Sequence, residues 1–280
     1  MFCDLGKARV YYETHGEGVP VLMIHGFYPD HLLMKGCMEP VFSERPGWKR
    51  IYFDLPGMGK TKSESWIDSS DKMLEVVLSF SERVIPEKNF LVIGESYGGY
   101  LARGVIAKKN KSVDGLMLIC PVVVPKPEER TLPARKVIVE DRKLVSELAT
   151  EDAFEFASMA VVQNRLTWER FRDEILVGVR AADPAFLKRL LLKAYPFSFP
   201  VDLLPEPYEK PVLILAGRQD TSVGYADDWG LLSNYPRATF AVLDMAGHNL
   251  QIEQPELFSA LTTEWLNRVE IERKATNTLH

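Results

Sequence analysis

Three residues of this 280-residue chain have the types and the order that nucleophilic catalysis requires. Ser96 stands in the sequence GESYG, which fits the pattern G-x-S-x-G, and Asp220 and His248 follow it in the sequences GRQD and AGHN. An imidazole can take the proton of a serine hydroxyl while a carboxylate orients the imidazole and stabilises its charged form. The order serine, acid, histidine therefore indicates a catalytic triad.

The elements expected around these residues place all three at one edge of a sheet. Each residue follows an apolar run typical of a buried strand, and a helix over Tyr97–Lys109 is expected to follow Ser96 directly. In open α/β sheets, ligands bind at the carboxyl ends of the strands. The strands concerned are Phe90–Gly94 before Ser96, Pro211–Ala216 before Asp220, and Thr239–Leu243 before His248.

Each of the three residues can also be interpreted without a catalytic role. G-x-S-x-G occurs by chance, an aspartate after a strand often caps a helix or forms a turn, and a histidine in a glycine turn is usually a surface residue. Asp244 is a competing acid, but it lies four residues before His248 on the same connection, whereas Asp220 has a strand end of its own. The joint occurrence of the three in order favours catalysis.

Strands and helices alternate through the first part of the chain. This alternation predicts βαβ units and a mostly parallel sheet, and the first two strands are expected to pair as a hairpin. The other expected elements of this part are strands at Arg9–Glu13, Val19–His25, Lys49–Asp54 and Val113–Cys120, and a helix at Ser69–Val84.

The alternation stops from Pro121 to about Pro205, where only helices are expected. Thr150 and Asp183 are predicted N-caps, with Pro184 in the first helical position. The predicted division is a core of residues 1–120 and 206–280, and a helical cap of residues 121–205. The expected helices are 136–148, 152–162, 167–179 and 184–194 in the cap, and 226–234 and 255–268 after it, with a frayed tail beyond Ile271.

Four stretches make the sequence resemble the α/β-hydrolase superfamily over almost its whole length. They are Ile24–Phe27 (IHGF), Asp54–Gly59 (DLPGMG), the GESYGG elbow, and the paired GRQD and AGHN segments. The resemblance implies an α/β fold with helices on both faces of a mostly parallel sheet and a helical cap inserted after the sixth strand.

The resemblance also assigns roles. Ser96 would attack a carbonyl, His248 would act as general base and then acid, and Asp220 would hold the imidazole. The backbone N–H groups of Phe27 and Tyr97 would form the oxyanion hole. We therefore expect a carboxylesterase-like serine hydrolase that forms an acyl-enzyme from a small or medium, partly apolar ester. Carbon–carbon bond, lactone or amide hydrolysis, cofactor-free perhydrolysis, and a non-catalytic receptor remain alternatives.

Aromatic and methionine side chains of the cap are the candidates for substrate binding. Aromatic and methionine side chains at helical spacing more often form a hydrophobic core than contact a substrate. The sequence does not predict the identity of the substrate. An aspartate nucleophile and an HGxP loop are missing, which disfavours epoxide chemistry, and Asp54 replaces the first glycine of a phosphate loop, which disfavours nucleotides. The candidates are Phe154, Met159, Trp168, Tyr195 and Phe197, with Phe156 and Phe199 beside them.

The resemblance implies a small-molecule substrate as the partner, and the composition disfavours other kinds of partner. The net charge is −5 with no basic stripe, so nucleic acid is not expected. The three cysteines lack disulfide or zinc spacing, and neither a metal nor a cofactor is expected. The N-terminal residues lack a signal-peptide pattern, and no apolar run reaches the ~18 residues of a membrane span. These features predict a cytoplasmic protein; the oligomeric state stays open.

Overall fold

The computed structural model describes residues 1–86 and 88–278, with side chains up to residue 275. An eight-stranded sheet in the order β1-β2-β4-β3-β5-β6-β7-β8 forms its centre. Strands β3 to β8 run parallel, and β1 and β2 are antiparallel to their neighbours. The bounds are β1 Phe2–Asp4, β2 Arg9–His15, β3 Val19–Ile24, β4 Trp48–Phe53, β5 Phe90–Glu95, β6 Val113–Ile119, β7 Val212–Gly217 and β8 Ala238–Leu243.

The expected hairpin of the first two predicted strands is wrong. Strand β4 lies between β2 and β3, and β2 pairs instead with β1, a strand that the sequence analysis missed. The physical reason is burial. Residues Pro20–Ile24 of β3 are buried, as a strand in the middle of a parallel sheet must be, whereas most of β2 is only half-buried.

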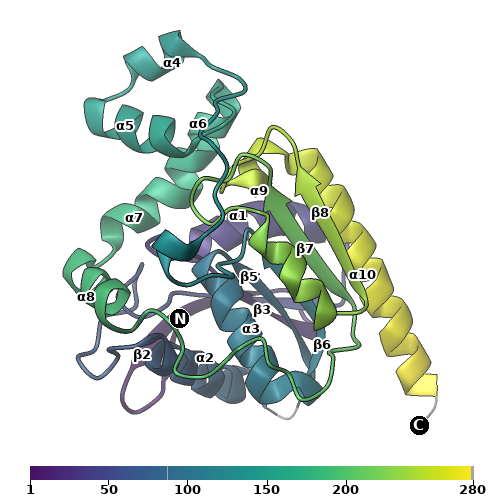
Figure 1. Ribbon diagram of the computed structural model, residues 1–280. Helices are drawn as coiled ribbons and strands as arrows, with labels where there is room; N and C mark the ends of the chain where they lie inside the picture. Colours follow the sequence, from purple (N-terminus) through teal and green to yellow (C-terminus); the bar gives the residue numbers. More distant parts are fainter. Residues whose placement is uncertain (87, 279–280) are drawn as a thin grey trace.

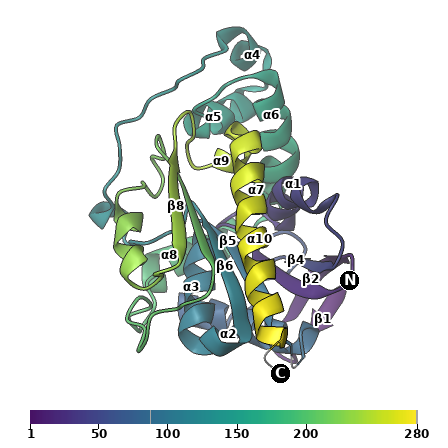
Figure 2. The ribbon, with the colours of Figure 1, turned by 90° about the vertical axis from the view of Figure 1, so that its right-hand side faces the viewer.

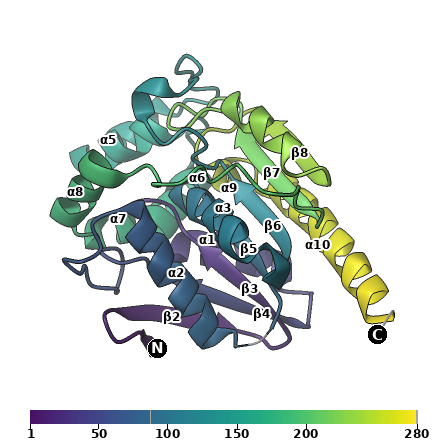
Figure 3. The same ribbon diagram turned by 60° about the horizontal axis from the view of Figure 1, so that its bottom comes forward.

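Helices cover both faces of the sheet. Helices α2 (Ser70–Val84) and α3 (Tyr97–Lys109) pack together on one face, and α1 (His31–Phe42) and α10 (Pro255–Thr278) pack together on the other (Figures 2 and 3). The sequence analysis missed α1, which contains Pro40. The tail expected to be frayed beyond Ile271 is instead helical as far as Thr278, because α10 continues through the good helix formers of residues 272–275; residues 279–280 lie outside the described part of the chain.

The segment between β6 and β7 is helical, as expected, and it stands over the carboxyl end of the sheet (Figure 1). The division at residues 121 and 205 stays a prediction. The helices are α4 Arg142–Glu147, α5 Thr150–Met159, α6 Arg165–Phe171, a π-helical turn at Arg172–Leu176, α7 Val177–Ala181 and α8 Pro184–Ala194.

Details of this segment correct the sequence analysis. The helix expected over 136–148 is confined to α4, and Val139 instead forms a β-bridge with Val162. The prediction of Thr150 as an N-cap is wrong, because Thr150 is the first residue of α5 and the helix has no side-chain capping hydrogen bond. Asp183 is confirmed as an N-cap, since its side chain accepts the N–H of Phe186.

After β7, the expected helix over 226–234 is a 3₁₀ helix, η4 (Asp227–Ser233), and a short helix α9 (Leu250–Glu253) follows His248. Within the described residues, no helix combines the length and the apolar character that a bilayer crossing requires.

Candidate active site

Ser96 occupies a strained turn between β5 and α3. Its φ of 53° and ψ of −115° lie outside the regions that most non-glycine residues adopt. Two glycines make this turn possible: a Cβ on Gly94 would lie 2.2 Å from the carbonyl oxygen of Gly98, and a Cβ on Gly98 would lie 2.1 Å from that of Ile24. The turn therefore has the geometry of a nucleophile elbow.

The three predicted catalytic residues form a continuous hydrogen-bonded chain. His248 Nε2 lies 2.9 Å from Ser96 Oγ, and His248 Nδ1 lies 2.8 Å from Asp220 Oδ2. The other carboxylate oxygen of Asp220 accepts the N–H groups of Ser222 and Val223, which fixes its orientation. Each of the three follows a different strand of the sheet, as the sequence predicted.

The competing acid Asp244 does not reach the histidine. Its side chain is exposed and accepts a hydrogen bond from Gln219 Nε2 at 2.7 Å. Asp220, by contrast, is fully buried, and its carboxylate is the one bonded to His248.

The electrostatics of the triad favour a charged imidazole. Burial alone would lower the pKa of His248, but the carboxylate of Asp220 and the carboxyl of Glu95 raise it to about 9. Burial would raise the pKa of Asp220, yet the charge of His248 and its hydrogen bond hold that pKa below its usual value. The site can therefore stabilise the imidazolium that forms when Ser96 loses its proton.

A fourth ionisable group, Glu95, faces the triad and was missed by the sequence analysis. Its Oε1 atom lies 3.6 Å from His248 Nε2, and its side chain is 2% exposed. Burial raises the pKa of Glu95 to about 7. Glu95 occupies one of the two variable positions of the G-x-S-x-G motif. The sequence therefore already shows an ionisable carboxyl group directly before Ser96.

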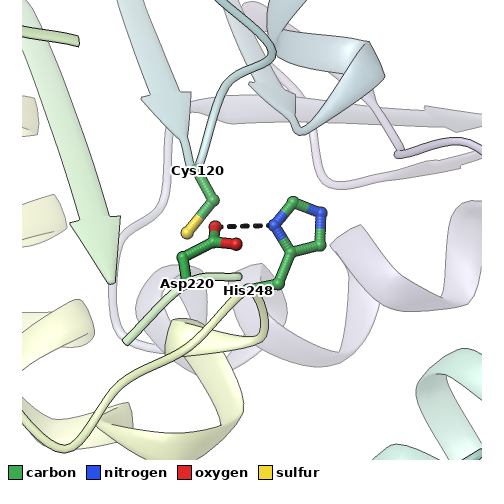
Figure 4. Close-up of side chains that lie close together, drawn as sticks. All are labelled: Cys120, Asp220 and His248. Carbon is green, nitrogen blue, oxygen red and sulfur yellow. Dashed lines mark hydrogen bonds and ion pairs between the residues drawn. The ribbon is translucent and has the colours of Figure 1, made fainter. Parts of the chain in front are cut away.

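Cys120 lies beside Asp220 and His248 at the end of β6 (Figure 4). Its sulfur, the Asp220 carboxylate and the His248 ring lie within 4.8 Å of one another, a spacing that could suit a metal ion. A metal would need a thiolate, however, and burial raises the pKa of this thiol well above its usual value. Asp220 and His248 are also already bonded to each other, so the cluster fits the triad better than a metal site.

A second candidate metal cluster lies on the sequence IHGFYPDH and the neighbouring DLPG loop. Asp30, His31 and Asp54 are buried and close together, but most of their polar atoms already have partners; His31 Nε2, which has no hydrogen-bond partner, lies 3.3 Å from Glu13 Oε1. Asp54 accepts the N–H and Nδ1 of His31 and the N–H of Lys60, and Asp30 caps α1 through the N–H of Leu32. These bonds indicate a loop anchor.

The two predicted oxyanion-hole residues lie side by side next to Ser96. The rings of Phe27 and Tyr97 are in edge-to-face contact, with centroids 5.1 Å apart. Tyr97 is the first residue of α3, so its N–H has no partner within the helix. Neither N–H donates a hydrogen bond to any other residue that the structure describes. Both remain available for a substrate oxygen.

A cavity of about 310 Å³ adjoins Ser96 and His248. Its walls come from the loop after β3, from the elbow, and from the helices of segment 121–205. It is mainly apolar, and Glu95 and Glu155 are the acidic groups in its wall. The lining residues are Gly26, Phe27, Tyr28, Pro29, Leu33, Glu95, Ser96, Glu155, Met159, Phe171, Ile175, Leu176, Val179, His248 and Asn249.

The five predicted substrate-binding residues divide between this wall and the packing behind it. Met159 lines the cavity, and Phe154, 72% exposed, lines a neighbouring surface hollow. Trp168, Tyr195 and Phe197 are buried and are not among the lining residues.

Those three side chains belong to aromatic packing. Trp168 packs in edge-to-face contact with Phe156, Tyr195 stacks on Tyr97, and Phe197 stacks on Tyr100. Aromatic composition alone could not distinguish the two environments. The lining positions Phe171, Ile175 and Val179 have the four-residue spacing of one helix face, a signal that could have found them.

Glu253 connects the histidine loop to segment 121–205 and was also missed. One carboxylate oxygen accepts the N–H groups of Val161 at 2.6 Å and Val162 at 3.2 Å, and the other accepts the N–H of Gly247 at 2.6 Å. Gly247 directly precedes His248. This buried carboxylate thus ties the backbone of the helical segment to the backbone that carries the imidazole of His248.

Comparisons with known proteins identify the family to which this fold belongs. A sequence profile described as "alpha/beta hydrolase fold" matches residues 19–255. The chain belongs to this family. A similar solved structure, an alpha/beta superfamily hydrolase from Oenococcus oeni, has a TM-score of 0.85 and 28% identity, covering 93% of this chain and 96% of that one.

Two curated relatives of this α/β hydrolase show the range of its family. A pimeloyl-[acyl-carrier protein] methyl ester esterase from Nitrosomonas europaea is 26% identical over 90% of this chain and 97% of its own length. A 2-hydroxy-6-oxo-6-(2'-aminophenyl)hexa-2,4-dienoic acid hydrolase from Metapseudomonas resinovorans is 23% identical over 98% and 93%. One relative is named as an esterase and the other as a hydrolase, and the substrates in the two names differ.

Proposed function

We propose that this α/β hydrolase is a serine esterase acting on a small or medium, partly apolar carboxylic ester. The observation that carries the proposal is the chain of two hydrogen bonds from Ser96 through His248 to Asp220. The adjoining apolar cavity supports an apolar group next to the ester, and the esterase among the relatives supports the bond type.

In the proposed reaction, Ser96 Oγ attacks the carbonyl carbon while its proton passes to His248 Nε2. The N–H groups of Phe27 and Tyr97 would stabilise the oxyanion of the tetrahedral intermediate. Collapse of the intermediate breaks the ester bond, and the leaving alcohol takes the proton from His248. Water then attacks the acyl-enzyme by the same route, releasing the carboxylic acid and restoring the serine hydroxyl.

Hydrolysis of a carbon–carbon bond is the second candidate, because the relative from Metapseudomonas resinovorans is named for a dienoic acid substrate. Such a substrate carries a carboxylate, and no lysine or arginine is found among the described residues that line the cavity. The ester is therefore the better match to the charges of the site.

The proposal is tested by turnover of short-chain nitrophenyl esters and by labelling with a fluorophosphonate probe. Ser96→Ala is expected to lower kcat by about 10⁴–10⁶-fold and to abolish labelling. Equal turnover by the wild type and Ser96→Ala would overturn the esterase. An unlabelled wild-type serine would instead favour a non-catalytic receptor on the same fold.

A further inference from the structure

The cavity at Ser96 adjoins a second hollow on the surface of segment 121–205. This outer hollow has a volume of about 450 Å³ and lies against α5, the π-helical turn and α7. Glu155, Leu176 and Val179 line both the inner cavity and the outer hollow. Because the same three side chains border both spaces, the two adjoin, and we call them together the passage. A substrate would have to extend past these side chains to reach from the inner cavity into the outer hollow.

Carboxyl groups predominate along the whole passage. Glu95 stands at the inner end, 2% exposed, Glu155 stands where the two spaces meet, and Glu151 and Asp152 line the outer hollow. Among the described residues that line either space, Arg180 is the one arginine, and there is no lysine. Its guanidinium is bonded to the carboxylate of Asp152. Negative charge is therefore in excess along the passage, because Arg180 is bonded to Asp152, and His248, which lines the inner cavity and can be positive, is bonded to Asp220.

One further guanidinium acts on the triad, that of Arg130, which opposes protonation of His248. Arg130 is not part of the wall of either space. Its three nitrogen donors are bonded to backbone carbonyls of Val124, Pro125 and Ser222. It is committed to fixing these loops and does not offer a site for an anionic substrate.

We propose that the passage selects extended esters whose far end carries a positive charge and discriminates against esters whose far end is anionic. This inference rests on the proposed esterase function and names its substrate class: an apolar segment beside the scissile carbonyl, with a cationic group in the outer hollow. An ammonium group there would lie among the carboxylates of Glu151, Asp152 and Glu155. A carboxylate, sulfonate or phosphate in the same place meets like charges.

The test uses nitrophenyl esters with acyl chains of one length and permanent end charges: hexanoate, 6-(trimethylammonio)hexanoate and 6-sulfohexanoate. A second series carries the same end groups on the alcohol, so that the charge reaches the outer hollow whichever half of the ester points outward. In the series whose charged end reaches the outer hollow, kcat/KM of the cationic ester is expected to exceed that of the anionic ester by about tenfold at low salt. Each exposed ion pair contributes up to about fivefold. At 1 M salt the ratio should approach one.

Variants assign the effect to the passage. The double substitution Glu151→Gln and Glu155→Gln should lower the ratio of cationic to anionic kcat/KM to about threefold or less; because the ratio is taken within one variant, a change common to all the esters cancels. Glu169→Gln is the matched control, because Glu169 is an exposed glutamate of α6 outside both spaces, and its ratio should equal that of the wild type.

The failures of the two proposals are distinguishable. If the neutral ester is not hydrolysed, the esterase proposal fails. If the neutral ester is hydrolysed but both series give a ratio near one, or if Glu169→Gln changes the ratio as much as the double variant, only the charge selection is overturned.

Discussion

The sheet edge and the helical segment above it hold their functional residues in different ways. Ser96, Asp220 and His248 each follow a strand of one continuous sheet, and their hydrogen bonds leave each side chain a single arrangement. The facing wall comes from short helices joined by a π-helical turn, packed on their own aromatic side chains. Under the proposed function, the edge would carry out the cleavage of the bond, and the helices would select the molecule that presents that bond.

The largest expected effect tests the edge by removing one charge without changing shape. Asp220→Asn should lower kcat by about 10⁴-fold, because an amide stabilises the wrong tautomer of His248 and cannot stabilise the imidazolium. Steady-state kinetics with a nitrophenyl ester measures the loss. Asp244→Asn is the control, since Asp244 is exposed and bonded to Gln219, and it should retain wild-type kcat. A comparable loss in both variants would contradict the assignment of the triad acid.

The next effect concerns Glu253, where the two regions meet. Glu253→Gln replaces an acceptor oxygen by an amide NH₂ that faces backbone N–H groups, so at least one buried donor loses its partner. The free energy of unfolding should fall by about 1–3 kcal/mol. Because Gly247 precedes His248, kcat and the rate of fluorophosphonate labelling should fall as well. Denaturant titration and labelling kinetics measure the two effects.

Glu39→Gln distinguishes positioning from general destabilisation. Glu39 is also a part-buried carboxylate with several partners, Arg50 and Tyr52, but it lies on α1 and does not line the cavity. The Glu39→Gln substitution should lower the free energy of unfolding and leave kcat unchanged. If Glu253→Gln behaves in the same way, Glu253 supports only the fold.

A smaller effect tests the wall of the cavity. Leu176→Ala shortens a side chain that borders both the inner cavity and the outer hollow. It should lower kcat/KM for medium acyl chains by about tenfold, the value of a buried apolar contact, and affect acetate esters little. Leu166→Ala is the control, since Leu166 is exposed on α6. An equal loss for all chain lengths would place the effect of Leu176 on folding and not on substrate fit.

The same difference between the regions explains what the sequence could predict. The sheet edge was predicted because its constraints are local: G-x-S-x-G needs glycines where backbones nearly touch, and buried strands need continuous apolar runs. The residues that line the cavity could not be separated from those that pack behind it. Trp168 and Met159 are both large apolar residues of the helical segment, and they differ only in which neighbours they contact. Long-range pairing was equally hidden, since nothing local in β2 shows that β4 will separate it from β3.

The smallest effect concerns Glu95, where the edge itself contributes charge to the cavity. Glu95→Gln removes a carboxyl 3.6 Å from His248 Nε2. The imidazole must be neutral to accept the serine proton, so kcat/KM rises with pH as His248 loses its proton, around pH 9 in the wild type. Without the nearby carboxylate the charged imidazole is less favoured, its pKa falls, and the rise should move to lower pH.

The measurement is the pH dependence of kcat/KM for the neutral hexanoate ester, compared with Glu169→Gln, which should keep the wild-type profile. At high pH, where His248 is neutral in both forms, Glu95→Gln and the wild type should differ little. The largest gain is expected below the pKa of the wild-type histidine. A rise that stays at the wild-type pH would mean that Asp220 alone sets the pKa of His248, and that Glu95 affects only the charge of the cavity.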